Sequence, residues 1–359
     1  MGIYLDAAAT AIHRPPSVKT AMLHALENYG NPGRGSHEYS LQASRCVQKC
    51  RKTVAGLFGA SASQLQFTSG ATESLNWAIS AVVAPGDHVI ATHLEHNAVL
   101  RPLYHVAELD VVDVGDIAQY IRPDTKAVVV STASNVTGQV VDLAPITAVC
   151  KHHGIPLIVD AAQTAGVLPI SLADADIICF TGHKHLFAPQ GIGGIVAKKA
   201  LPPIKLGGTG TDTFYKKMPD HQESGTLNTP AIAGLLAGVE YIMASGMDRL
   251  LAKALAVANT FVERLENVTV YSPARLALPI VAINIGDMPS AQVADILATE
   301  YNIAVRGGGH CAPMLHTKYN TVEQGMVRFS FSSYNTAEEA ILAASAINQI
   351  ANQIQSQLS

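Results

Sequence analysis

The sequence predicts an α/β protein, with a mainly parallel sheet of seven strands flanked by helices and a smaller α+β domain after it. Short apolar runs rich in Val and Ile alternate with helical stretches over roughly the first 200 residues. Polar residues follow several of these runs directly, as is typical where the carboxyl ends of parallel strands border a ligand site. From about residue 229, long alanine-rich helices replace the alternation.

The amino-terminal part is expected to contribute a short strand and two helices. The strand covers residues 3–5, and the helices cover about 17–28 and 41–58, separated by the glycine-rich turn YGNPGRGSHEYS. Helices such as 73–83 and 144–153 then separate successive strands, which indicates parallel pairing. The seven expected strands of the sheet are 64–68, 88–92, 110–114, 127–131, 157–160, 177–180 and 194–197.

The remaining pattern predicts the smaller domain. A helix at about 231–244 precedes it, and a helix at about 248–265 opens it. We place the boundary near residue 245, so that residues 13–245 form a large domain and residues 246–359, together with residues 1–12, form a small one. The other expected elements are strands near 268–271, 280–285, 303–305 and 327–331, and helices near 291–300 and from 337 onward.

Composition argues against several classes of protein. The 359 residues are 48% hydrophobic and 14% charged, which is enough to bury a large core. The net charge of −4 includes no basic block, so no nucleic-acid partner is expected. No apolar run is long enough for a membrane span and the first residues do not resemble a signal peptide, so we expect no membrane partner and a cytoplasmic location. Five cysteines, an odd number, fit a reducing compartment.

Two charged residues at the ends of neighbouring apolar runs define the expected active centre. Asp160 ends the run PLIVD, where a buried carboxylate needs a cationic partner. Lys184 follows IICFTGH, where partial desolvation favours the neutral, nucleophilic amine. Either residue alone is more typical of a turn or a solvated loop. Together they match pyridoxal phosphate, which needs an acid for its pyridinium nitrogen and a lysine for its aldehyde.

A phosphate site is expected at FTSGATESLN. The amides of Ala71 and Thr72 and the Thr72 hydroxyl would point at an anion, assisted by the helix dipole. Thr181 and His183 could donate to the same phosphate. The alternative for this stretch is a capping box built from Ser69 and Thr72.

Three further side chains follow strands of the predicted sheet. His96, in LEHNAV, could stack on a cofactor ring and relay protons, although a lone histidine is more often structural. Gln163 could donate to the phenolic oxygen of the ring, and Asn135 lies after the 127–131 strand. Both amides could instead cap loops.

The stretch VRGGGHCAPM places Arg306, three glycines and Cys311 in one flexible loop. Nearby positive charge favours a thiolate, so Cys311 is the one cysteine in a setting typical of a nucleophile. Arg328, inside a strand pattern, needs a carboxylate partner, which could be a substrate carboxylate or a structural salt bridge. No metal is expected, because the histidine pairs 152–153 and 183–185 lack carboxylates or thiols at ligand spacing. The remaining cysteines, expected as packed or surface thiols, are Cys46, Cys50, Cys150 and Cys179.

Along nearly its whole length the sequence resembles the class V aminotransferase family of fold-type I pyridoxal-phosphate enzymes. Within that family it is most similar to the cysteine desulfurases and selenocysteine lyases, and RGGGHCA matches the pattern of the group II desulfurases. The chain is shorter than typical group II members, so connectors near an acceptor site are expected to differ. The motifs that carry the resemblance are YLDAAAT, FTSGATESLN, LEHNAV, VDAAQ, TGHK, SGTLN, RGGGHCA and RFSFSSYNT.

The resemblance implies a role for each of these residues. Lys184 would hold the cofactor aldehyde, Asp160 the pyridine nitrogen, His96 the ring face and Gln163 the phenolic oxygen. Arg328 and Asn135 would bind the substrate carboxylate, and Arg306 would also bind the substrate. In a homodimer, Thr226 would reach the phosphate bound by the other subunit. The residues implied for the phosphate within one subunit are Ala71, Thr72, Thr181 and His183.

The reaction implied is the conversion of L-cysteine to L-alanine. Lys184, assisted by His96, moves the Cα proton, and the Cys311 thiolate attacks the substrate sulfur and keeps it as a persulfide. An acceptor protein or a small thiol then takes the sulfur. The sequence leaves open a selenocysteine lyase that acts on L-selenocysteine, another class V lyase or aminotransferase, and a scaffold protein without activity.

Overall fold

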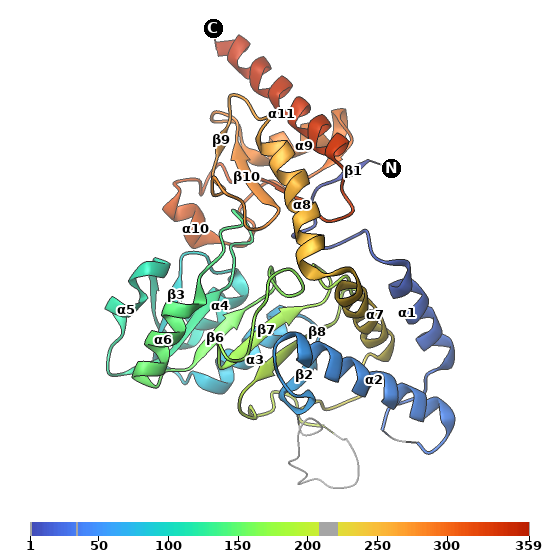
Figure 1. The fold of residues 1–359 in the computed structure, drawn as a ribbon. Helices are drawn as coiled ribbons and strands as arrows, with labels where there is room; N and C mark the ends of the chain where they lie inside the picture. The colour runs from blue at the N-terminus through green and yellow to red at the C-terminus, as the bar shows by residue number, and fades with distance from the viewer. Residues whose placement is uncertain (1, 34, 208–221, 359) are drawn as a thin grey trace.

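The chain folds into two parts that meet at a bend between two helices. The computed structural model describes residues 2–33, 35–207 and 222–358. The larger part, drawn in blue to yellow, lies below the smaller, orange and red part in Figure 1. Helix α7 (Thr229–Ser245) packs in the core of the larger part, and α8 (Met247–Val262) packs in that of the smaller. The two helices are bent by 84° around Gly246, so we propose that the domain boundary lies there.

The larger part is built on a seven-stranded sheet, which confirms the predicted fold. Strand order is β2-β8-β7-β6-β5-β3-β4, and β8 is antiparallel to both of its neighbours while the other pairs are parallel. The expected strands recur with small shifts, the largest at β4, which begins two residues earlier than its apolar run. The strands are β2 (Leu65–Thr68), β3 (His88–Thr92), β4 (Glu108–Val112), β5 (Thr125–Ser131), β6 (Leu157–Asp160), β7 (Ile177–Thr181) and β8 (Gly193–Ala197).

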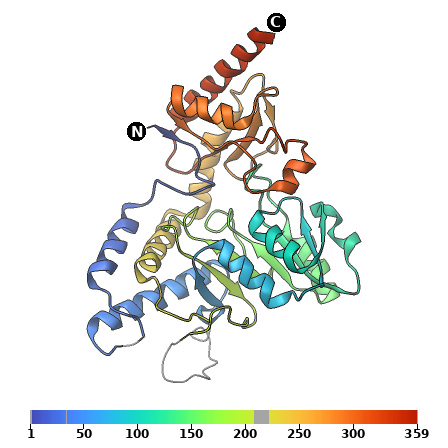
Figure 2. The same ribbon diagram turned by 180° about the vertical axis from the view of Figure 1, so that it is seen from behind.

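Helices cover both faces of this sheet, which explains why its central strands are apolar throughout. Alternate residues of each strand point to opposite faces. Val89 and Val129 pack with α3 (Ala71–Val82) and α4 (Asn97–Val106). Ile90 and Val128 pack instead with α2 (Glu38–Leu57), α6 (Leu143–His153) and α7. In Figure 1 α2 and α6 lie in front of the sheet, and the opposite face is seen in Figure 2.

Shorter elements complete the larger part. Helix α1 (Pro16–Asn28) packs along α7, and α5 (Ile117–Tyr120) follows β4. Two short 3₁₀ helices cover Ala62–Gln64 and Val114–Asp116.

The smaller part combines an antiparallel sheet with helices and includes the start of the chain. Strand β1 (Ile3–Tyr4) pairs in parallel with β11 (Ile303–Ala304). The sheet has the order β12-β10-β9, and its strands are β9 (Thr269–Val270), β10 (Ile280–Asn284) and β12 (Val327–Ser330). The helices after α8 are α9 (Ser290–Glu300), α10 (Pro313–Lys318) and α11 (Ala337–Leu358). This pairing supports our proposal that residues 1–12 belong with the small domain.

Among the described residues, no single helix has the length and apolar character of a membrane span. The bent pair α7 and α8 reaches that length and character only when the two helices are counted together.

A buried ion pair fixes the start of the third described range, residues 222–358. Arg51 on α2 and Glu223 form two hydrogen bonds, of 2.7 and 2.5 Å, with both side chains almost inaccessible to solvent. The same carboxylate accepts from the amide of Phe67 at 2.6 Å, and the guanidinium lies 4.7 Å from the centre of the Phe67 ring. Glu223 therefore ties the stretch that carries Thr226 to β2 and α2. Because both side chains are buried, each charge is stabilised mainly by the other rather than by water.

We predict that Arg51→Met lowers the free energy of unfolding by about 3 kcal/mol or more, because Glu223 would stay buried without its cation. Urea unfolding followed by circular dichroism measures the change. Arg45 is the matched control on the same helix, since it pairs with Glu38 at 2.9 Å but remains 67% exposed. Arg45→Met should cost less than about 1 kcal/mol. Equal costs for the two variants would contradict a stabilising role that depends on burial.

Candidate active site

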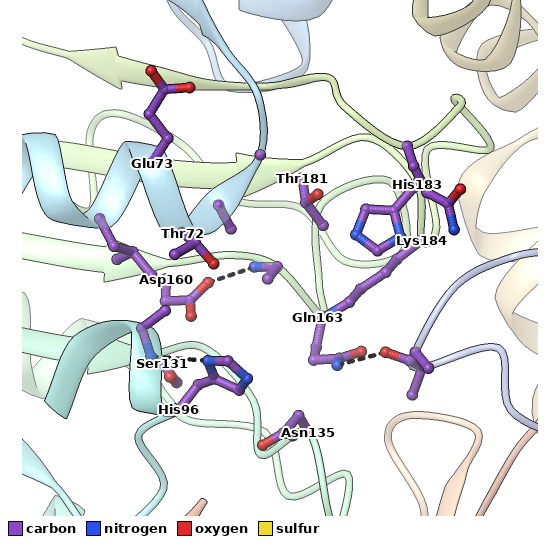
Figure 3. A pocket seen from close by; sticks show the side chains of 18 of the residues that line it. Thr72, Glu73, His96, Ser131, Asn135, Asp160, Gln163, Thr181, His183 and Lys184 are labelled. Carbon is purple, nitrogen blue, oxygen red and sulfur yellow. Dashed lines mark hydrogen bonds between the residues drawn. The ribbon is translucent and has the colours of Figure 1, made fainter. Parts of the chain in front are cut away.

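A cavity of about 350 Å³ opens where the carboxyl ends of β5, β6 and β7 meet. Figure 3 shows side chains from several elements around this one space. The structure brings together most of the residues singled out in the sequence, but Cys311 and Thr226 do not line the cavity. The predicted residues that do line it are Ala71, Thr72, His96, Asn135, Asp160, Gln163, Thr181, His183, Lys184, Arg306 and Arg328.

Asp160 stands at the end of β6 and is only 6% exposed. One carboxylate oxygen accepts a hydrogen bond of 2.8 Å from the amide of Ala162. Burial raises the pKa of this carboxyl group, and the Ala162 hydrogen bond and the charge of Lys184 oppose that rise. A cation placed in the cavity against Asp160 would remove the cost of its charge.

Lys184 follows β7 and faces the same cavity. Burial lowers the pKa of its amine to about 8; the charge of Asp160 opposes this shift, and the charges of Arg328 and Arg306 reinforce it. About a tenth of the amine is therefore neutral near pH 7, far more than for an ordinary lysine. Lys184 has the chemistry of a nucleophile that can bind an aldehyde covalently.

The amino terminus of α3 borders the cavity at the place where FTSGATESLN predicts an anion cradle. Its N-cap is Gly70, which has no side chain to bond to the helix, so the alternative of a capping box with Ser69 and Thr72 is wrong. The first amides of the helix, at Ala71 and Thr72, have no acceptor within the helix and border the cavity. A Cβ atom at Gly193 would lie 2.6 Å from the Cα atom of Gly70, so the close approach of β8 to this turn requires glycine.

Thr181 and His183 border the same side of the cavity. The Nδ1 atom of His183 lies 3.1 Å from the hydroxyl of Thr10, and burial lowers the pKa of His183 to about 4. His183 is therefore neutral at pH 7 and can act on an anion as a hydrogen-bond donor rather than as a cation.

His96 is the N-cap of α4, which fixes both its direction and its tautomer. Its Nδ1 atom accepts a hydrogen bond of 3.0 Å from the amide of Ala98. Burial lowers its pKa to about 4, and the charges of Lys184 and the nearby arginines add to the shift. His96 is thus a neutral imidazole with its proton on Nε2, which is the atom left to face a ligand.

Two buried amides border the cavity with unused hydrogen-bonding capacity. The Nε2 atom of Gln163 donates to the carbonyl of Ala8 at 3.2 Å, and that of Asn135, Nδ2, donates to the carbonyl of His310 at 2.8 Å. Both side-chain oxygens are buried without a partner among the described residues. Buried polar atoms are almost always paired in folded proteins, so these atoms indicate that the cavity is shaped for a polar ligand.

Arg328, on β12, is 1% exposed and has the structural salt bridge that the sequence left open. One nitrogen donates to a carboxylate oxygen of Asp6 at 2.6 Å, and another donates to the carbonyl of Asn135 at 2.9 Å. The sequence analysis missed Asp6, whose signal was an acid within the YLDAAAT motif. Nε of Arg328 has no partner in the described part of the chain, so the guanidinium keeps some capacity for a ligand.

Cys311 is exposed and lies beside the cavity, on a loop that hydrogen bonds tie to neighbouring elements. The amide of Asn97 donates to the carbonyl of Cys311 at 2.7 Å, and His310 bonds through Nε2 to the carbonyl of Met326 at 2.8 Å. His310 and Cys311 both have positive φ, at 49° and 58°, a conformation that non-glycine residues rarely adopt. A guanidinium nitrogen of Arg306 lies 4.0 Å from the sulfur.

Thr226 lies in a different surface pocket, together with Lys205 and Ser224. Its contact with the phosphate bound by a second subunit stays a prediction.

The sequence analysis also missed a buried acid behind the cavity. Glu95 is fully buried and accepts hydrogen bonds from the hydroxyls of Thr92 and Ser131, at 2.6 and 2.7 Å, and from the Ser131 amide at 2.9 Å. Burial raises its pKa to about 7, although these hydrogen bonds oppose the shift. The signal was an acid directly before His96 in LEHNAV. Glu95 holds the turn that carries His96 against the end of β5.

The described residues contain no group of three or more side chains arranged to hold a metal ion.

Comparisons with known proteins agree with this geometry. The sequence profile of the family Aminotransferase class-V matches residues 3–341. A cysteine desulfurase of Escherichia coli O8 (strain IAI1) is 33% identical over 94% of this chain and 90% of its own length. A probable cysteine desulfurase of Methanothermobacter thermautotrophicus is 30% identical over 97% and 94%. The solved apo structure of a cysteine desulfurase from Thermococcus onnurineus NA1 has a TM-score of 0.91 and 29% identity, covering 98% of this chain and 95% of that one.

We predict that His96 stays neutral, with its proton on Nε2, from about pH 5.5 to 8, because burial and nearby cations lower its pKa to about 4. Nitrogen NMR of histidine-labelled protein measures this, and the spectrum of His96→Gln assigns the signal. Protonation with a midpoint near that of a free histidine would show that the imidazole is neither buried nor bonded as described.

Proposed function

This chain belongs to the aminotransferase class-V family, and we propose that it acts as a pyridoxal-phosphate-dependent cysteine desulfurase. It converts L-cysteine to L-alanine and holds the sulfur as a persulfide on Cys311. The observation that carries the proposal is an exposed thiol beside a cavity that contains a lysine of depressed pKa and a buried aspartate. The relatives named cysteine desulfurase support it.

The residues of the cavity fit pyridoxal phosphate. Lys184 and Asp160 attract each other but form no direct ion pair within the described part of the chain, which leaves space for a ring between amine and carboxylate. The unpaired buried amides and the first amides of α3 supply polar partners for the rest of the cofactor. When bound, the cofactor would act as an electron sink that acidifies the Cα proton of an amino acid. The residues that would hold it are Ala71, Thr72, His96, Asp160, Gln163, Thr181, His183 and Lys184, with Thr226 from a second subunit.

Gln163 and His96 would hold the cofactor in different ways. The Nε2 atom of Gln163 carries a second hydrogen besides the one donated to Ala8, and it can donate that hydrogen to a phenolic oxygen. His96 offers a neutral imidazole face for stacking and keeps Nε2–H as a donor.

Proton transfer at the substrate Cα is assigned to Lys184. Its neutral amine can accept the Cα proton at Nζ and return it to the product, because its pKa of about 8 lies close to the working pH. His96 cannot accept a proton at Nδ1, which already accepts from Ala98. His96 therefore assists by donating a hydrogen bond, or the proton itself, from its Nε2 atom.

The substrate carboxylate would bind beside Arg328. Two nitrogens of the Arg328 guanidinium already donate to Asp6 and to the carbonyl of Asn135. The substrate carboxylate can therefore use only the remaining hydrogen-bonding capacity of this guanidinium. Arg306 lies at the same cavity and contacts the Cys311 sulfur, so it links the carboxylate site to the thiol. The bond formed at Cys311 joins its sulfur to the substrate sulfur. The substrate carbon–sulfur bond breaks, and its electron pair stays on the carbon, which takes up a proton to give alanine.

The five cysteines are all unpaired, which supports a reducing compartment and hence the cytoplasm. A homodimer, in which Thr226 reaches the neighbouring phosphate, completes the proposal.

We predict that Cys311→Ser loses at least about a hundredfold of the rate of alanine formation from L-cysteine while keeping the visible absorbance of bound cofactor. Alanine is measured with a reductant present. Cys46→Ser is the control, because Cys46 lies buried on α2 away from the cavity, and its rate should stay within about twofold. Equal rates for Cys311→Ser and the wild type would identify a lyase that does not need the thiol, and L-selenocysteine would be tried next. No alanine from the wild type would mean another substrate.

We predict that the rate at which cofactor-free protein attaches pyridoxal phosphate rises about tenfold between pH 7 and pH 9 and then levels off. The reason is that Lys184, with a pKa of about 8, gains its neutral form as pH rises through that value. Absorbance follows the reaction, N-acetyl-lysine methyl ester corrects for the reagent's own pH dependence, and Lys184→Ala should not react. A rise of about a hundredfold without a plateau would mean that the lysine has an ordinary pKa.

A further inference from the structure

A groove between α3 and α4 adjoins the active-site cavity and has Cys311 on its wall. Its volume is about 630 Å³, and Thr72, His96 and Ala98 line both spaces. We call it the α3–α4 groove; its outer wall includes Asn76, Arg101 and His105. Cys311 thus lies on the wall of a groove that opens to solvent, beside the cavity where the substrate would bind. The proposed function leaves this groove without a role.

The charge of the groove is uniformly positive or neutral. Arg101 and His105 stand one helical turn apart on α4, both exposed, and none of the described residues that line the groove is acidic. Neither side chain forms an ion pair or a hydrogen bond with any residue that the structure describes, whereas Arg122 and Lys198 are paired with acids. Arg306 adds a further cation beside the Cys311 sulfur. An anion would find unused partners here.

The size and walls of the groove suit a small molecule. Volumes of about 300 to 1,000 Å³ are usual for small-ligand sites. Ile79, Pro102 and Val106 supply apolar wall, and the packing of Ile79 with Leu103 and Val99 holds the two helices in place. The amide of Asn97, in the first turn of α4, donates to the carbonyl of Cys311 at 2.7 Å, so the thiol is fixed relative to this helix.

We propose that the α3–α4 groove binds a small thiol that carries a carboxylate, and that this thiol takes the sulfur from Cys311. The inference rests on the proposed function, because it requires a persulfide on Cys311. The carboxylate binds Arg101, with His105 beside it, and the apolar wall receives the carbon chain. The incoming thiolate attacks the outer sulfur of the persulfide. A new sulfur–sulfur bond forms, the bond to Cys311 breaks, and Cys311 leaves as a thiolate, so no separate oxidant or reductant is needed.

The experiment compares three small thiols on persulfide-loaded holoenzyme. One equivalent of L-cysteine loads the enzyme, and alanine formed in this single turnover counts the loaded sites. Each thiol is then added at equal thiolate concentration, and mass spectrometry follows the loss of the persulfide. The probes are 3-mercaptopropionate, its neutral amide 3-mercaptopropionamide, and the cationic cysteamine.

For the wild type we expect 3-mercaptopropionate to react about tenfold faster than its amide, with cysteamine slowest, and we expect 1 M salt to reduce the difference. Arg101→Gln should reduce the preference for the anion to about twofold. Arg249→Gln is the matched control, since Arg249 is an exposed arginine on α8 outside the groove, and it should keep the full preference.

Three results would overturn the inference: equal rates for the acid and its amide, an anion preference that survives in Arg101→Gln, or a persulfide that none of the three thiols removes. Each of them requires that alanine has formed and the persulfide has loaded. If the wild type forms no alanine, the proposed function itself fails, so the two failures are distinguishable.

Discussion

The site depends on two opposite charges, those of Lys184 and Asp160, which attract each other without forming a direct ion pair in the described part of the chain. Lys184 and Asp160 influence each other's pKa across the cavity, yet they form no direct ion pair within the described residues. Strand register keeps them apart: Asp160 pairs with Cys179 on the neighbouring strand, and Lys184 lies five residues beyond Cys179. A direct ion pair would hold the lysine protonated and fill the space. Because the two groups stay apart, the amine keeps a lowered pKa, the carboxylate keeps the free-energy cost of its buried charge, and a cationic ring has room between them.

A second constraint joins the two ends of the chain at the same place. Arg328 bonds to Asp6 across 322 residues of sequence, and the amide of Ser330 donates to the carbonyl of Leu5 at 2.7 Å. The first residues then run past the cavity, where the carbonyl of Ala8 accepts from Gln163. The proposed substrate end of the cavity therefore lies beside the smaller part and the amino terminus, while the proposed cofactor end lies at the large sheet. Any movement between the two parts would change the distance from carboxylate site to lysine.

This division explains what the sequence could and could not predict. Asp160 and Lys184 were predictable because the carboxyl end of an apolar strand is a local pattern and parallel strands bring such ends to one edge. The partner of Arg328 was not, since nothing local ties an arginine near the end of the chain to an acid near its start. Glu95 was missed for another reason: two of its three hydrogen bonds come from Ser131 and form only after β3 and β5 pair. The end of a strand can be predicted from the local sequence pattern, whereas the partners of buried charges are set only by the complete fold.

The glycines of the Cys311 loop have more than one role. Gly307 is needed because a Cβ there would lie 2.4 Å from the carbonyl oxygen of Ser290, and Gly308 has a φ of 108°. These two glycines permit a close approach and a left-handed backbone, which a glycine-rich pattern alone does not distinguish from flexibility. The carbonyl of Cys311 accepts a hydrogen bond from the amide of Asn97, so the backbone of Cys311 is tied to the start of α4. An acceptor that reaches the thiol in this position must approach along the α3–α4 groove, and the lining of that groove therefore decides which acceptors fit.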